Sequence, residues 1–88
     1  MAVGAKAIEQ ALRQALEPVR LEVEDDSHRH VGHAGAREGG HYTVRVVSEC
    51  FAGLGRVARH RLVYHALATL MPGGIHALAI DARTPDET

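Results

Sequence analysis

The stretch Phe51–Leu67, FAGLGRVARHRLVYHAL, decides how the rest of the chain is arranged. It opens with an aromatic residue and two glycines and then continues with helical periodicity. At about 100° per residue around a helix axis, its apolar side chains gather on one broad arc. That predicted arc contains Val57, His60, Val63, Tyr64, Leu67 and Met71, and the opposite side contains Arg61, His65 and Thr69, with Arg59 on a flank. The pattern predicts that the arc packs into the core, with His60 as a core histidine rather than a ligand.

A helix and two strands are predicted before this stretch. Residues 5–17 have helical periodicity and end at Pro18, which disfavours the helical conformation of the residue before it. The apolar face of this helix is predicted to contain Ile8, Leu12, Ala15 and Leu16. Residues 19–24 and 42–48 alternate between apolar and polar side chains, the pattern of half-buried strands. The first of these strands is expected to bury Val19, Leu21 and Val23.

One further strand follows the central helix, which Pro72, Gly73 and Gly74 are expected to stop. Residues 75–82 are apolar on both faces, as in a strand covered on both sides, and residues 84–88 form a polar tail with a helical turn from Thr84. Consecutive strands pair most simply antiparallel, whereas a strand–helix–strand unit is parallel. We therefore expect one α+β domain over residues 1–88, with its core in residues 5–83 and a three-stranded mixed sheet.

Composition limits the possible functions. The net charge of −1 argues against strong non-specific binding to nucleic acid, which depends on neutralising phosphates. The single cysteine, Cys50, excludes an internal disulfide, fits a reducing cytoplasm and is expected to be a packed or idle thiol. No apolar run approaches the length of a transmembrane helix, and no catalytic motif is present, so we expect a cytoplasmic, non-enzymatic protein.

Histidine is unusually frequent. The chain has seven histidines, and four of them lie within fourteen residues: His28, His30, His33 and His41. If the third strand lies beside the second, the topology also brings His76 to this end of the sheet. Imidazole nitrogens bind transition metals, so two or three of these side chains could form a metal site. The alternative is a hydrophilic loop whose histidines face water.

Three segments carry a resemblance to a known family. LEVEDDSHRHVGH, HYTVRVVSECFAGLGRVARHRLVY and GIHALAIDARTP resemble the BolA-like proteins with a histidine-type loop, and the match covers about residues 8–85. The resemblance implies an αββαβ fold similar to the class II KH module, with helices packed on one face of the sheet and a parallel third strand. The GxxG segment that joins two helices in KH modules is missing from the corresponding place.

The resemblance also implies a function. Family members associate with monothiol glutaredoxins and share a bridging [2Fe-2S] cluster with them, in iron homeostasis or cluster delivery. His76 would supply one ligand, and His30 lies at the matching loop position, with His33 as a close competitor. The partner's cysteine and a glutathione thiolate would supply the other two ligands.

The family has a second role, in DNA binding and transcriptional regulation. The candidate residues are Arg56, Arg59 and Arg61, although arginines that project from a helix are commonly a solvated surface. The exposed side of the same helix, with Arg59, Arg61 and His65, could instead form part of a partner surface. A third interpretation is a divalent-metal binder that uses loop histidines without a partner. Alone, the protein is expected to be a monomer or a weak homodimer.

Overall fold

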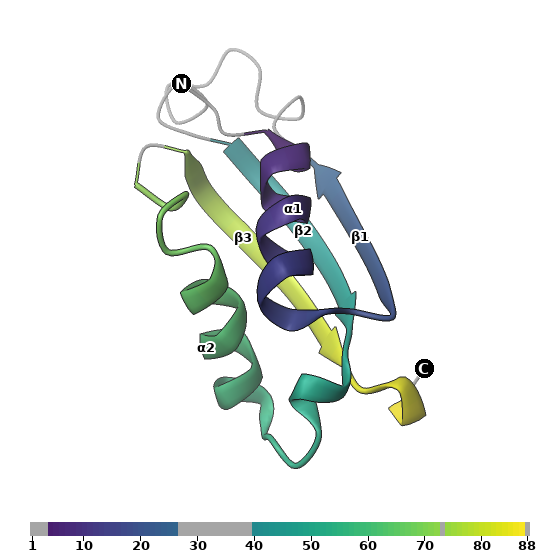
Figure 1. The fold of residues 1–88 in the computed structure, drawn as a ribbon. Helices are drawn as coiled ribbons and strands as arrows, with labels where there is room; N and C mark the ends of the chain where they lie inside the picture. The colour runs from purple at the N-terminus through teal and green to yellow at the C-terminus, as the bar shows by residue number, and fades with distance from the viewer. Residues whose placement is uncertain (1–3, 27–39, 73, 88) are drawn as a thin grey trace.

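The computed structural model describes residues 4–26, 40–72 and 74–87. Along the chain the elements are α1 (Ala5–Leu16), β1 (Arg20–Asp25), β2 (Gly40–Val47), the 3₁₀ turn η3 (Glu49–Phe51), α2 (Arg56–Ala66), β3 (Ile75–Arg83) and the 3₁₀ turn η4 (Pro85–Glu87). Figure 1 shows α1 lying across the sheet and α2 running alongside β3. None of the helices in the described ranges is long and apolar enough to cross a membrane.

The three strands form one mixed sheet in the order β1-β2-β3. β1 pairs with β2 antiparallel, from Arg20 opposite Val47 to Asp25 opposite Tyr42. β2 pairs with β3 in parallel. Within the described residues, β1 and β3 each have a strand neighbour on one side only. The predicted α+β topology is therefore confirmed, because alternation marks the strands and connectivity determines their directions.

The core lies between the inner face of the sheet and the two helices. Its fully or almost fully buried residues are Ile8, Leu12, Leu16, Tyr42, Val44, Val46, Phe51, Val63, Leu67 and Ile75. Because residues of α1, β2 and α2 share this one cluster, both helices cover the same face of the sheet.

The first helix ends before Pro18, as expected, but two residues that were predicted to be buried, Ala15 and Val19, are exposed. Glu17 adopts the left-handed conformation, with φ 45°, directly before Pro18. Ala15 is exposed, since the buried stripe runs through Ile8, Leu12 and Leu16 only. Val19 is 68% exposed because it lies in the turn that joins α1 to β1, outside the strand.

The predicted buried arc of the central helix is also partly wrong. Val57 and Tyr64 are 65% and 42% exposed, whereas Val63 and Leu67 are fully buried. The buried stripe continues backwards from Val63 by one turn to Arg59, whose side chain is only 16% exposed. A prediction from hydropathy assigns every arginine to the solvent side of the helix. It therefore centred the buried face on Val57 and Tyr64 rather than on the side that contains Arg59. His60 is half-buried beside this stripe rather than inside the core.

The third strand is not covered on both faces, contrary to the prediction. Ala77 and Ala79 are exposed because the helices lie only on the opposite face of the sheet. Leu78, Ile80 and Ala82 are partly buried on the inner face. The helical turn expected from Thr84 is present as η4.

Candidate functional site

Two histidines lie side by side where β2 and β3 begin. The ring centroids of His41 and His76 are 5.1 Å apart, with the ring planes tilted by 40°. His76 is exposed, and His41 is half-buried. The expectation that topology brings His76 close to His41 is confirmed.

A β-bulge brings this pair together. Gly40 pairs with Ile75 and the next residue, His41, pairs with Ala77, so His76 is the extra residue on β3. An extra residue interrupts the regular alternation and redirects its side chain. Buried Ile75 before the bulge and partly buried Leu78 after it keep the apolar residues of β3 on the core side.

The residues on either side of the histidine-rich segment lie at the same end of the sheet. The Asp26 N–H donates to the His41 carbonyl oxygen at 2.7 Å, and the Gly40 N–H donates to the Gly74 carbonyl oxygen at 3.0 Å. The Thr43 hydroxyl donates to the Asp26 carboxylate at 2.6 Å, which ties β1 to β2 here. His30 and His33, the two loop candidates, lie outside the described residues.

Beside the pair, the outer face of the sheet is hollowed. The hollow has a volume of about 330 Å³ and is lined by Asp26, His41, Tyr42, Thr43, Ala77, Leu78 and Ala79. Small side chains at Ala77 and Ala79 leave the surface open to a second molecule. Within residues 4–26, 40–72 and 74–87, no group of three histidine, cysteine or acidic side chains is placed to hold a metal ion. The described part of the chain thus offers a pair of imidazoles that could contribute to a site shared with other ligands.

Cys50 lies at the other end of the sheet. It follows β2, an eight-residue strand, whereas His76 lies beside the start of β2. At about 3.3 Å per residue this separation is more than roughly 20 Å. Cys50 is exposed, so it is not the packed thiol that was one of the two expectations, and its Sγ donates weakly to the Leu16 carbonyl oxygen at 3.4 Å.

The three candidate arginines of α2 differ in their surroundings. Arg56 and Arg61 are exposed, as expected. Arg59 is not, because its Nε donates to the Leu54 carbonyl oxygen at 2.8 Å and its Nη1 donates to the Ala82 carbonyl oxygen at 3.2 Å. Its two terminal nitrogens also bind both oxygens of Glu87, at 2.6 and 3.0 Å. The expectation that Arg59 projects into solvent is therefore wrong, and Arg59 joins α2 to β3 and η4.

This contact changes the titration of the tail. The Arg59 guanidinium, followed by the Thr84 N–H, lowers the pKa of Glu87 to about 2. Sequence reasoning missed Glu87 because it treated residues 84–88 as a polar tail. The sequence signals for this ion pair are weak: acidic residues shortly after the last strand, and arginines at the start of the central helix.

The sequence and the fold both match known proteins. The family described as "BolA-like protein" matches residues 12–87. "Protein BOLA1, chloroplastic" from Arabidopsis thaliana is 43% identical over 96% of this chain, and human "BolA-like protein 1" is 47% identical over 90% of it. The chain spans only 55% and 56% of the length of these two relatives.

Solved structures agree over nearly the whole chain. The BolA domain of SufE1 from Arabidopsis thaliana superposes with a TM-score of 0.85 at 43% identity, covering 100% of this chain and 99% of that one. BolA1 from the same plant gives a TM-score of 0.84 at 42% identity, covering 100% and 98%. The agreement of family match, sequence identity and fold shows that this chain belongs to the BolA-like protein family.

Proposed function

We propose that this protein is a non-enzymatic, cytoplasmic partner of a monothiol glutaredoxin and that the two share a bridging [2Fe-2S] cluster for iron–sulfur trafficking or iron homeostasis. The observation that carries the proposal is the exposed imidazole of His76, the residue that the family resemblance assigns as a ligand. His76 lies at the same end of the sheet as Asp26 and Gly40, the residues that flank the segment 27–39. His76 and either His30 or His33 are the ligands proposed from this chain.

The chemistry suits a shared site. A neutral imidazole replaces a negatively charged thiolate, which lowers the negative charge of a cluster and raises its reduction potential. Two histidines from one chain leave two positions for a cysteine and a glutathione thiolate from the partner side. The distance of Cys50 from His76 leaves imidazole, and not thiolate, as the ligand type that this chain can offer there.

The surface of α2 supports the docking of a protein partner. Val57 and Tyr64 place exposed apolar area on the outer side of the helix, next to exposed Arg61 and His65. Tyrosine and arginine are enriched where protein surfaces associate. We include these four residues in the proposed glutaredoxin surface and leave out Arg59, whose guanidinium is bound within the chain.

DNA binding is less well supported as the main function. Of the three arginines proposed for it, Arg59 already donates to a carboxylate and two carbonyl oxygens. Salt-dependent binding of a duplex by the free protein, lost in Arg56→Gln and Arg61→Gln but kept in His76→Ala, would favour the regulator over the cluster partner.

Anaerobic reconstitution with a monothiol glutaredoxin and glutathione tests the proposal. We expect a heterodimer whose visible circular dichroism differs from that of the glutaredoxin alone. His76→Ala should abolish that spectrum, and either His30→Ala or His33→Ala should abolish it as well. Cys50→Ser is the matched control and should leave the spectrum unchanged. An unaltered glutaredoxin spectrum with the wild-type chain would contradict the proposal.

A further inference from the structure

A second hollow lies away from the histidine pair, between the start of α2 and the final part of β3. Its volume is about 650 Å³, and its lining contains Leu54, Gly55, Arg56, Arg59, His60 and residues 80–83. Ile80 is four residues along β3 from His76, so the two places are roughly 13 Å apart or more. This α2–β3 groove is therefore separate from the proposed cluster site.

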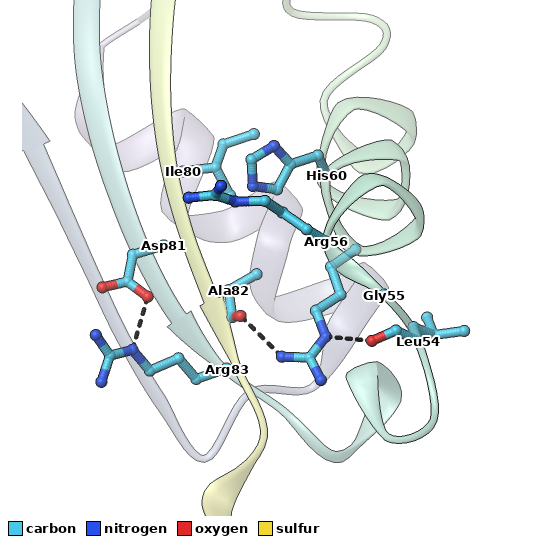
Figure 2. Close-up of a pocket in the computed structure, with 9 residues that line it drawn as sticks. Leu54, Gly55, Arg56, His60, Ile80, Asp81, Ala82 and Arg83 are labelled. Carbon is cyan, nitrogen blue, oxygen red and sulfur yellow. Dashed lines mark hydrogen bonds and ion pairs between the residues drawn. The ribbon is translucent and has the colours of Figure 1, made fainter. Parts of the chain in front are cut away.

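The groove is rich in positive charge. Three guanidinium groups, of Arg56, Arg59 and Arg83, line it with one carboxylate, that of Asp81. Arg83 Nε donates to Asp81 Oδ1 at 2.8 Å, so that carboxylate is already paired. Figure 2 shows the side chains of Arg56 and His60 extending from α2 towards Ile80. Within the part of the chain that the structure describes, neither Arg56 nor His60 forms an ion pair.

The other wall of the groove is the free edge of β3. The Arg83 carbonyl oxygen accepts from the Ser48 N–H, so the backbone of residue 83 faces β2. Backbone groups of alternate residues in a strand point to opposite sides, so Ile80 and Ala82 face away from β2. Figure 2 shows the Ala82 carbonyl oxygen directed towards α2, where Arg59 donates to it. Among the described residues no strand lies on that side of β3, so the Ile80 N–H and C=O and the Ala82 N–H line the groove as strand-edge groups without a strand partner there.

One carboxylate is already bound at the end of the groove. Glu87 binds Arg59 through both carboxylate oxygens, which is the planar two-bond geometry that a guanidinium favours. Arg56 precedes Arg59 by one helical turn and presents the same group to the adjoining space. As far as the described residues show, the groove thus combines an open strand edge with a guanidinium, that of Arg56, which has no carboxylate partner and could bind a second one.

We propose that the α2–β3 groove binds a short, extended acidic peptide segment of a protein partner. The peptide backbone pairs with Ile80 and Ala82, and a glutamate or aspartate side chain binds Arg56 beside His60. Pairing with a strand edge supplies affinity, and the position of the carboxylate supplies selectivity. A nucleic-acid backbone fits less well, because it cannot form the strand ladder with Ile80 and Ala82. The proposal does not depend on the cluster function.

Amide-resolved NMR of the full chain tests this groove. The probe is a short peptide, blocked at both ends, in which threonine and glutamate alternate, and the control peptide has glutamine in place of glutamate. We expect the acidic peptide to shift the Arg56, His60, Ile80 and Ala82 signals and to slow hydrogen exchange at the Ile80 and Ala82 amides. Arg56→Gln should weaken binding about tenfold, whereas Arg61→Gln, exposed on the same helix but outside the groove, should not.

Three results would contradict the proposed peptide groove. Equal binding of the glutamine peptide would show that Arg56 does not recognise the carboxylate. Unchanged hydrogen exchange at Ile80 and Ala82 would show that the peptide does not pair with the edge of β3. Duplex DNA that shifts the same residues while the acidic peptide does not would assign the groove to nucleic acid instead. His76→Ala should bind the peptide normally, so failure of the cluster function and failure of this groove are distinguishable.

Discussion

Replacing Gly40 by alanine would place a methyl group against the ring of Tyr42. A Cβ atom built on Gly40 lies 2.6 Å from the Cζ and hydroxyl oxygen atoms of Tyr42, far closer than non-bonded carbon atoms approach. The tyrosine ring has little room to move, because it is 2% exposed and its hydroxyl accepts a hydrogen bond from the Gly4 N–H at 3.1 Å. Residue 40 also begins β2 directly before His41, so the clash falls beside the histidine pair.

The expected cost follows from overpacking. Forcing one methyl group into a packed core lowers the free energy of unfolding by about 1–3 kcal/mol. A chain of this size has a total stability of roughly 4–13 kcal/mol, so the change is a large share of it. At about 4–8 °C per kcal/mol, the midpoint of thermal unfolding should fall by roughly 10 °C.

Urea unfolding followed by far-ultraviolet circular dichroism measures the effect, since the chain has no tryptophan for fluorescence. Gly55→Ser is the control, because a Cβ at Gly55 meets nothing within 4 Å and serine is favoured at a helix N-cap. In a Tyr42→Leu background, which removes the ring, Gly40→Ala should cost less than about 0.5 kcal/mol. Undiminished stability of Gly40→Ala, or the same loss in both backgrounds, would show that contact with the Tyr42 ring does not restrict residue 40.

Three further predictions test other parts of the fold. Ser48 is 1% exposed, donates to the Leu16 carbonyl oxygen and accepts from the Cys50 N–H, so Ser48→Ala should cost about 1–3 kcal/mol in urea unfolding; a loss near zero would argue against that buried connection. Leu67→Ala should cost about 2–5 kcal/mol, whereas Tyr64→Ser should stay within about 0.5 kcal/mol, and a comparable loss in both variants would restore the helix orientation expected from hydropathy, which buries both residues. Because the folded pKa of Glu87 is lowered to about 2, its contribution to stability is present above about pH 4.3 and is lost as the pH falls towards 2. Arg59→Gln should raise the Glu87 pKa in a carboxyl-carbon NMR titration, and an unchanged value would show that Arg59 is not the main cause.

Local pattern and connectivity were enough to predict the topology. Alternating residues on either side of Val23 and Val44 mark two strands, and the helix before Ile75 makes the third strand parallel. The same topology predicted the proximity of His41 and His76. The bulge that makes His76 the extra residue was not predictable, because it depends on the pairing between strands and not on either strand alone.

The face of α2 was not predictable because distant groups decide it. Arg59 occupies a position in the buried stripe only because Leu54, Ala82 and Glu87 supply acceptors for its guanidinium. Hydropathy alone rotates the helix away from that arrangement and buries Tyr64 instead. The surface of α2 available to a partner therefore became evident only in three dimensions.

The proposed function requires an imidazole nitrogen of this chain to ligate a cluster shared with a monothiol glutaredoxin. Pulsed EPR on the reduced heterodimer, with only this chain's histidines labelled with ¹⁵N, tests it directly. We expect ¹⁵N couplings of iron-bound imidazole that disappear in His76→Ala and persist in His60→Ala, because His60 lies in the α2–β3 groove away from the proposed cluster site. A reduced cluster with no ¹⁵N coupling from this chain, or with coupling unaffected by His76→Ala, would contradict it.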